Sequence, residues 1–163
     1  MTEKNKDFQT RFGEGLISGI SVGVFFILLG AIFATTPNLF DKIIEFFKDF
    51  DIKPVPNIEF VYLPVPKSPW LHSAVYSALG QFSIIWGTFQ IVILALRFVA
   101  GSSLSKKAET VSDIVFWFGV YYLVTICLNT STTLTIWFVF WALVIMLIGL
   151  SLIVRAVILA IRI

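Results

Sequence analysis

The sequence predicts an all-α integral membrane protein: a bundle of four transmembrane helices, an extracytoplasmic amphipathic helix and a short proline-bracketed extended arm. Of its 163 residues, 58% are hydrophobic and only 13% are charged, whereas a soluble domain has about 25% charged residues. Three long segments contain no charged residue, and they lie between Glu14 and Asp41, Lys67 and Arg97, and Asp113 and Arg155. A water-soluble surface needs more charge than this, so most of the outer surface is expected to face lipid.

The uncharged segments set the predicted spans. A bilayer core about 30 Å thick requires about 20 helical residues. The first two segments hold one span each, at 15–36 and 70–97. The third, of 41 residues, is too long for one helix and contains the polar run at 129–133. It is therefore expected to hold two spans, at 110–128 and 134–158, joined by an external turn. The apolar run of the first span exceeds the length of about 7–15 residues that is usual in signal peptides, so we expect it to stay uncleaved.

Lysine and arginine residues are divided unequally between the two sides. Four lie in the loop 37–69, namely Lys42, Lys48, Lys53 and Lys67. Eight lie on the side of the tail 1–14, the loop 98–109 and the C-terminal residues 159–163: Lys4, Lys6, Arg11, Arg97, Lys106, Lys107, Arg155 and Arg162. Because cytoplasmic segments are enriched in these residues, both termini are predicted to be cytoplasmic in a cell membrane. The compact loops and the lack of extracellular cysteines favour a bacterial or archaeal source.

The loop 37–69 holds all six prolines of the chain. Apolar residues recur at helical spacing over 38–50, which predicts an amphipathic helix in the outer membrane interface or lying as a lid over the bundle. Two Pro-Val-Pro triplets bracket the extended arm at 54–66. A single strand leaves backbone groups unpaired, so the arm needs a partner: another copy, a different subunit or the top of its own bundle. Its candidate docking residues are Ile58, Phe60 and Tyr62.

Glycines recur along the first span at Gly15, Gly19, Gly23 and Gly30. Small residues at this spacing let two helix backbones approach closely in lipid, where van der Waals packing drives association. The stripe is therefore either an interface between subunits or a surface for tight packing against other spans of the same chain.

The second span is the most polar. Its candidate polar face includes His72, Tyr76, Gln81, Ser83 and Gln90. Unpaired polar groups are costly in hydrocarbon, so this face is expected to point into the bundle, a cavity or a partner. Two interpretations follow: hydrogen bonding between helices, or the wall of a transport pathway.

Three charged residues, Arg97, Asp113 and Arg155, fall near the predicted cytoplasmic interface on three different spans. They form either a charge cluster that fixes the bundle or binds an anionic headgroup, or independent side chains that reach to water. Asp113 is expected in the first turn of the third span, where a carboxylate opposes the helix dipole.

Catalytic patterns are missing. The chain has one histidine and one cysteine, Cys127, so no metal, haem or disulfide site is predicted, and we expect no cofactor. The net charge of +2 is too small to indicate nucleic-acid binding. The sequence favours a non-enzymatic subunit or interaction module of a larger or self-associating membrane complex. Its expected partners are the lipid bilayer and another protein or a second copy of the chain. The alternative is a small homo-oligomeric channel or transporter whose second span lines the pathway.

Overall fold

The computed structural model describes residues 3–56 and 58–161. It is mostly helical, at 78%, and four of its helices are long and apolar enough to cross a membrane, as the sequence predicts. The elements, in order, are α1 (Glu3–Thr35), α2 (Leu39–Lys48), β1 (Phe50–Val55), β2 (Ile58–Pro66), the 3₁₀ turn η1 (Pro69–His72), α3 (Ser73–Val99), α4 (Leu104–Cys127) and α5 (Leu134–Ala160).

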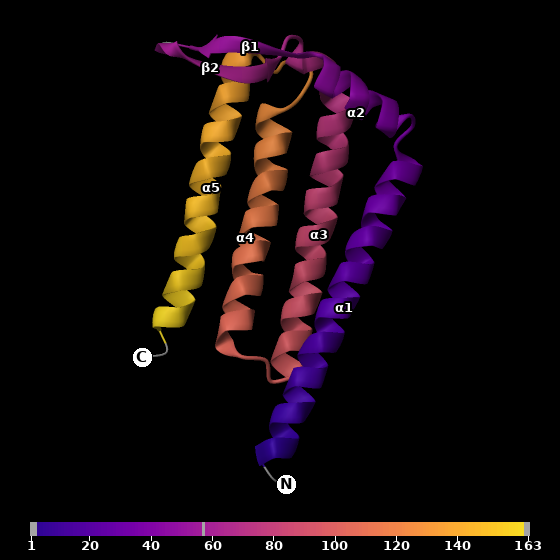
Figure 1. The fold of residues 1–163 in the computed structure, drawn as a ribbon, viewed down its shortest axis with the longest axis vertical. Coiled ribbons are helices and arrows are strands. Elements are labelled where there is room, and N and C mark those ends of the chain that lie inside the picture. The colour runs from indigo at the N-terminus through magenta and orange to yellow at the C-terminus, as the bar shows by residue number, and fades with distance from the viewer. Residues whose placement is uncertain (1–2, 57, 162–163) are drawn as a thin grey trace.

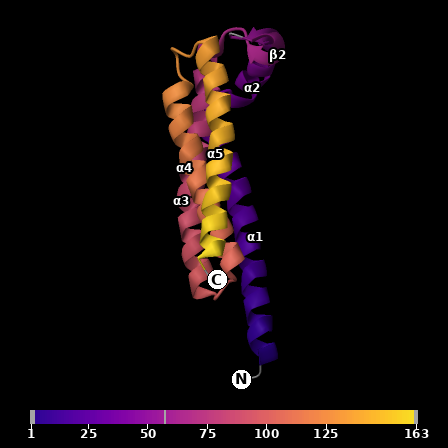
Figure 2. The same cartoon turned by 90° about the vertical axis from the view of Figure 1, so that its left-hand side faces the viewer.

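The four long helices run side by side in the order α5, α4, α3, α1 (Figure 1). Their main contacts join α3 to α4, α4 to α5 and α1 to α3, so α1 and α5 form the two edges of the layer. Helix α2 and the β1–β2 hairpin, together called the cap here, lie across one end, and both chain ends lie at the other (Figure 1). Viewed at right angles, the hairpin and α1 lie on the same side of the α3–α4 pair (Figure 2).

Two helices begin earlier than the charge gaps predict. Helix α1 begins at Glu3 rather than near residue 15, and α4 begins at Leu104 rather than at 110. Both extensions contain lysine and glutamate, which are good helix formers, so these helices continue past the apolar segment. Asp113 consequently lies in the third turn of α4, and the predicted position in the first turn was wrong.

The extended arm is half of an antiparallel hairpin. Strand β1 pairs with β2, with Phe50 opposite Pro66 and Lys53 opposite Leu63, and the register shifts at Pro54 and Val55. The partner of the arm is therefore the segment directly before it in the same chain. That pairing occupies one edge of the arm, with a partner that the three alternatives considered from sequence did not include, and the amphipathic helix ends at Lys48, two residues early.

Small residues allow the inner helices to pack closely. A Cβ atom at Gly87 of α3 would lie 3.3 Å from the Phe118 ring of α4, and one at Gly119 would lie 2.4 Å from Leu147 of α5. Buried Ser112 of α4 also donates a hydrogen bond of 2.8 Å to the carbonyl oxygen of Ser151 in α5. Both interfaces of α4 thus depend on a glycine, because a larger residue at Gly87 or Gly119 would displace the neighbouring side chain.

Candidate functional site

The cap is attached to the bundle by Asp49, which follows α2. Its Oδ2 atom accepts hydrogen bonds of 2.9 Å from the Nε2 atom of His72 and from the backbone N–H of Ser68. Its carbonyl oxygen accepts a third, also 2.9 Å, from the backbone N–H of Lys67. His72 is buried, and its ring meets the Phe46 ring edge-to-face, with centroids 5.1 Å apart. These bonds join the base of the hairpin to the start of α3.

The same contacts change the acidity of Asp49. Burial raises the pKa of this carboxyl, but hydrogen bonds from His72 and Ser68, with the nearby charges of His72 and Lys67, outweigh burial and leave the pKa below its usual 3.8. Asp49 is therefore ionised at neutral pH and accepts both bonds as a carboxylate.

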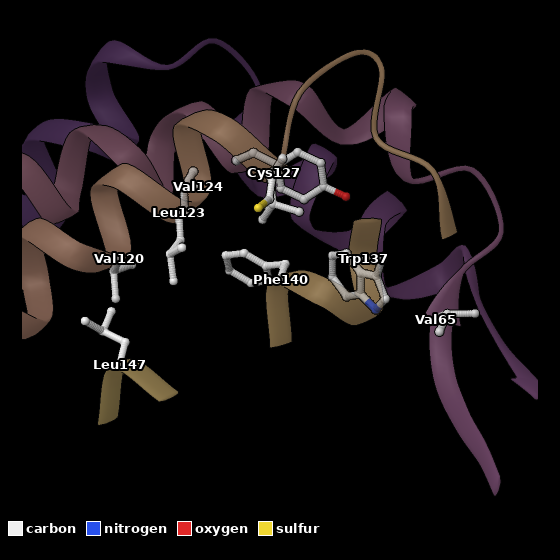
Figure 3. Close-up of a cluster of buried hydrophobic side chains, with 10 residues drawn as sticks. Val65, Val120, Leu123, Val124, Cys127, Trp137, Phe140 and Leu147 are labelled. Atoms are coloured by element: carbon white, nitrogen blue, oxygen red, sulfur yellow. The ribbon is translucent and has the colours of Figure 1, made fainter. Parts of the chain in front are cut away.

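Beneath the cap lies a cluster of aromatic rings. Trp137 of α5 lies 6.1 Å from Phe46 and from Phe50 and 6.3 Å from Tyr76, measured between ring centroids. Figure 3 shows Trp137 between Val65 of the hairpin and the buried residues of α4. The rings border an open aromatic groove of about 740 Å³, bounded by the cap and by α3, α4 and α5.

The predicted polar residues of α3 are divided between the inside and the surface. His72, Tyr76, Ser83 and Gln90 are buried, whereas Gln81 is exposed. The hydroxyl of Ser83 donates to the Leu79 carbonyl oxygen at 2.7 Å within its own helix. The hydroxyl of Tyr76 is buried with no hydrogen-bond partner in the described part of the chain. His72 itself lies in η1, before α3 begins.

Gln81 belongs to a polar pocket of about 480 Å³ between α3 and α4, near the end that carries the cap. Its walls come from α3, from the last turns of α4 and from the α4–α5 turn, and its lining comprises Ser73, Tyr76, Ser77, Gly80, Gln81, Ile84, Tyr121, Val124, Thr125, Leu128, Asn129 and Thr130. Eight of these twelve side chains carry a hydroxyl or an amide, and none is charged. The pocket and the aromatic groove lie on different sides of α3, and Tyr76 borders both.

The four stripe glycines of α1 face open space. A Cβ atom built at Gly15, Gly19, Gly23 or Gly30 would meet no atom within 4 Å. Tight packing against other spans of the same chain, one of the two interpretations of this stripe, is therefore wrong for the described residues. The stripe lies on the free surface of an edge helix.

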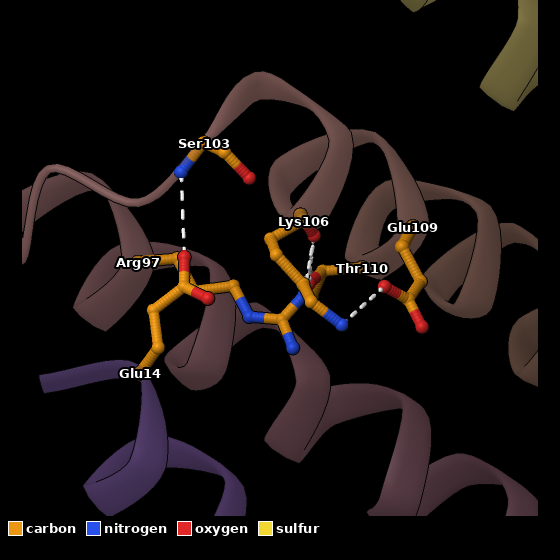
Figure 4. Close-up of polar contacts among 6 residues, drawn as sticks. All are labelled: Glu14, Arg97, Ser103, Lys106, Glu109 and Thr110. Atoms are coloured by element: carbon orange, nitrogen blue, oxygen red, sulfur yellow. Dashed lines mark hydrogen bonds and ion pairs between the residues drawn. The ribbon is translucent and has the colours of Figure 1, made fainter. Parts of the chain in front are cut away.

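The three charged residues near the other end form no ion pair. Among the described residues, Arg97, Asp113 and Arg155 lie in no pair within 4.0 Å. The Nη1 atom of Arg97 instead donates to the carbonyl oxygen of Lys106 and to the hydroxyl of Thr110 (Figure 4). Arg97 thus joins the end of α3 to the first turns of α4 without a direct ion pair to Asp113. The charge cluster considered from sequence, including its binding of an anionic headgroup, stays a prediction.

The hairpin exposes large apolar side chains. Phe60 is 86% exposed and Tyr62 is 60% exposed, and Ile58 on the same strand is also exposed. Alternate residues of a strand lie on one face, so these three share a face. Val65, on the other face of β2, is fully buried over the bundle. The predicted docking residues are therefore on the surface, although the backbone of their strand is paired on one edge.

Sequence reasoning missed Asp49 as a site residue. Asp49 falls inside the amphipathic helix predicted over 38–50, and its partner His72 is 23 residues further along the chain. No periodicity links two positions that far apart; only the turn of the hairpin brings them together.

No group of three or more potential metal ligands occurs in residues 3–56 and 58–161. None of the protein-family models, curated proteins or solved structures compared with the chain matches it. The site has to be interpreted from its own geometry.

Proposed function

We propose that the chain crosses a cell membrane four times with both termini in the cytoplasm, and that it serves as a non-enzymatic interaction subunit of a larger or self-associating membrane complex. The observation that carries this proposal is the free glycine stripe of α1. This stripe packs against a transmembrane helix of another subunit.

The direction of the stripe supports this role. At 3.6 residues per turn, successive residues are about 100° apart around a helix axis. On that basis Gly15, Gly19, Gly23 and Gly30 centre roughly 180° from the buried residues Ile17, Leu28 and Ile32. The glycines therefore face away from α3. Backbone exposed along such a stripe favours close approach of a second helix in lipid.

The arrangement of the ends supports the proposed topology. Four spans bring both termini to one side, and α1 begins and α5 ends on the side opposite the cap (Figure 1). The excess of lysine and arginine on the side of the termini, eight against four, favours the cytoplasm for that side. The cap then lies outside, at the level where aromatic side chains are enriched in membrane proteins.

The test is substitution of Gly19 by leucine, with Gly149→Leu as the matched control. Gly149 of α5 is likewise open, with no atom within 4 Å of a built Cβ, but it lies outside the stripe. We expect Gly19→Leu to abolish association, measured as the mass of the purified complex in mild detergent, and Gly149→Leu to leave that mass unchanged. An unchanged mass for Gly19→Leu would show that α1 is not the contact surface. Whether the lost component is a second copy or another protein identifies the partner.

A second candidate function is a small homo-oligomeric channel or transporter with α3 lining the pathway. The observation that favours it is the exposure of Ser77 and Gln81 on the surface of α3, which puts such a pathway between copies rather than inside one. Flux of a polar solute into liposomes, lost on Gln81→Leu and retained on Thr88→Val, is the expected result. Absence of flux with the parent protein would end this candidate.

A further inference from the structure

The polar pocket between α3 and α4 differs from the other polar sites of α3 because two of its side chains make no hydrogen bond within the described part of the chain. Ser83 is fully buried and bonded within α3. Ser77 and Gln81, by contrast, are exposed, and neither side chain makes a hydrogen bond to the described part of the protein. Their hydrogen-bonding capacity is left for something outside the chain.

The unpaired polar side chains of the pocket lie at an unusual depth for exposed groups of a membrane-spanning helix. Gln81 is eight residues beyond Ser73, the first residue of α3, which is about 12 Å along the helix axis. Half of a hydrocarbon core is about 15 Å thick. In the four-span arrangement proposed above, on which this inference rests, an exposed amide therefore lies deep in the outer leaflet. An unpaired amide in such surroundings costs several kcal/mol.

The lining indicates what kind of molecule removes that cost. Hydroxyl and amide groups supply both donors and acceptors, and no charged side chain is present to balance a phosphate or an ammonium group. An ion taken from water into this pocket would lose its hydration without a counter-charge. An uncharged molecule with several hydroxyl groups would find partners on both walls.

Part of this hydrogen-bonding set is already oriented. The hydroxyl of Thr125 donates to the Tyr121 carbonyl oxygen at 2.8 Å, so its oxygen keeps its lone pairs as an acceptor in the pocket lining. Asn129 is held by bonds from the backbone and side chain of Ser131 to its Oδ1 atom. Gly80 forms the floor, where a Cβ atom would lie 3.6 Å from Val124.

We propose that the pocket between α3 and α4 binds an uncharged polyhydroxyl group, supplied either by the sugar headgroup of a neutral lipid or by a free sugar or polyol. In either case Gln81 and Ser77 bind it from α3, and Thr125 binds it from α4. Ile84, Val124 and Leu128 form an apolar patch beside them, against which the carbon skeleton of the ligand packs.

The test uses the full chain in nanodiscs of phosphatidylcholine that contain a minor fraction of either diglucosyl diacylglycerol or phosphatidylglycerol. Lipid retained by the protein is counted by native mass spectrometry. We expect selective retention of the glycolipid, reduced about tenfold by Gln81→Leu, because loss of one or two hydrogen bonds costs about 1.4 kcal/mol. Thr88→Val is the matched control, because Thr88 is an exposed polar residue of α3 outside the pocket whose hydroxyl bonds to Ile84 in its own helix.

A second arm separates the two sources of the ligand. Binding of trehalose to the detergent-solubilised protein, followed by saturation-transfer NMR and lost in Gln81→Leu, would assign the pocket to a free sugar. Ser77→Val provides the same readout if Gln81→Leu does not fold.

Three results would overturn the proposal: binding of neither probe, equal binding by Gln81→Leu and the parent, or preferential retention of phosphatidylglycerol. The mass spectra also count protein copies per nanodisc, so failure of the α1 interface is read separately. A protein that does not enter nanodiscs contradicts the spanning arrangement and this inference with it.

Discussion

Substitution of Asp49 by asparagine is expected to loosen the cap while leaving the helix layer intact. The Oδ2 atom of Asp49 is the common acceptor for His72 and for the backbone N–H of Ser68, each at 2.9 Å. Hydrogen bonds to a charged group contribute about 1.5–3 kcal/mol and neutral ones about 1 kcal/mol. Removing the charge from two bonds of a partly exposed group therefore costs about 2 kcal/mol in total.

Cys127 provides an intrinsic reporter of this change. It is the single cysteine of the chain, and it is buried in the same apolar cluster as Val65 of the hairpin. If lifting of the cap exposes this cluster, 2 kcal/mol raises the open population, and with it the rate of alkylation by a maleimide, about 30-fold. The control is Asp51→Asn, because Asp51 is exposed and, among the described residues, its side chain bonds only to the backbone N–H of Ile52. An increase of less than about threefold, or an equal increase in the control, would refute the role of Asp49 as the attachment.

The pH dependence follows from the lowered pKa of Asp49. A carboxyl whose pKa is depressed in the folded state stabilises that state above its unfolded pKa and loses the contribution as pH falls through the lower value. The parent is therefore expected to unfold at a higher temperature than Asp49→Asn at pH 7. The difference is expected to shrink as the pH falls through the usual pKa of 3.8 and to disappear below the lowered pKa of the folded state. A gap in unfolding temperature that persists at more acidic pH would show that the charge of Asp49 is not its source.

Two further predictions concern the packing of the helix layer. Gly119→Ala places a Cβ against the side chain of Leu147. The overpacking costs about 1–3 kcal/mol and the helix-propensity gain offsets about 1 kcal/mol, so a net destabilisation of up to about 2 kcal/mol is expected. Gly149→Ala makes no such contact and is expected to be neutral or stabilising by up to about 1 kcal/mol. The midpoint of thermal unfolding in detergent distinguishes them, and equal midpoints would contradict the tight α4–α5 contact. Arg97→Met is expected to lower the free energy of unfolding by about 1–2 kcal/mol, through loss of the bonds to Lys106 and Thr110, and so to lower the same midpoint. Full stability of this variant would show that Arg97 does not hold the α3–α4 junction.

The four long helices were predictable because hydropathy is summed over about 20 residues, so no single position decides the outcome. The hairpin was not predictable in the same way. Phe50 ends the helical periodicity of α2 and begins β1, and a strand of six residues that contains a proline gives a weak signal. The register is set instead by the bonds at Asp49, whose partners lie in the segment that follows the hairpin.

The candidate site divides along the same line. The residue types of the polar span were visible in the sequence, but the division between buried Ser83 and exposed Gln81 depends on where α3 meets α4. Gln81 and Ser83 are two residues apart, which is about 200° around the helix axis. The polar face predicted from sequence therefore combined residues from two different sides of α3. The buried side of α3 can be assigned only when the position of the neighbouring helix α4 is known.

The free sides of the two edge helices differ in a way that supports the contact surface proposed for α1. Each edge helix has one main neighbour, so each leaves a long side free. On α5 this side carries large aliphatic residues, among them Ile145, Met146 and Leu152, which suit hydrocarbon chains. On α1 it carries the four-glycine stripe together with large apolar residues such as Phe26 and Ile27, and each glycine costs a helix about 1 kcal/mol relative to alanine. Lipid gives no compensation for that cost, whereas a closely packed helix does. The contrast between two equally apolar edges of one layer therefore supports a protein partner on α1.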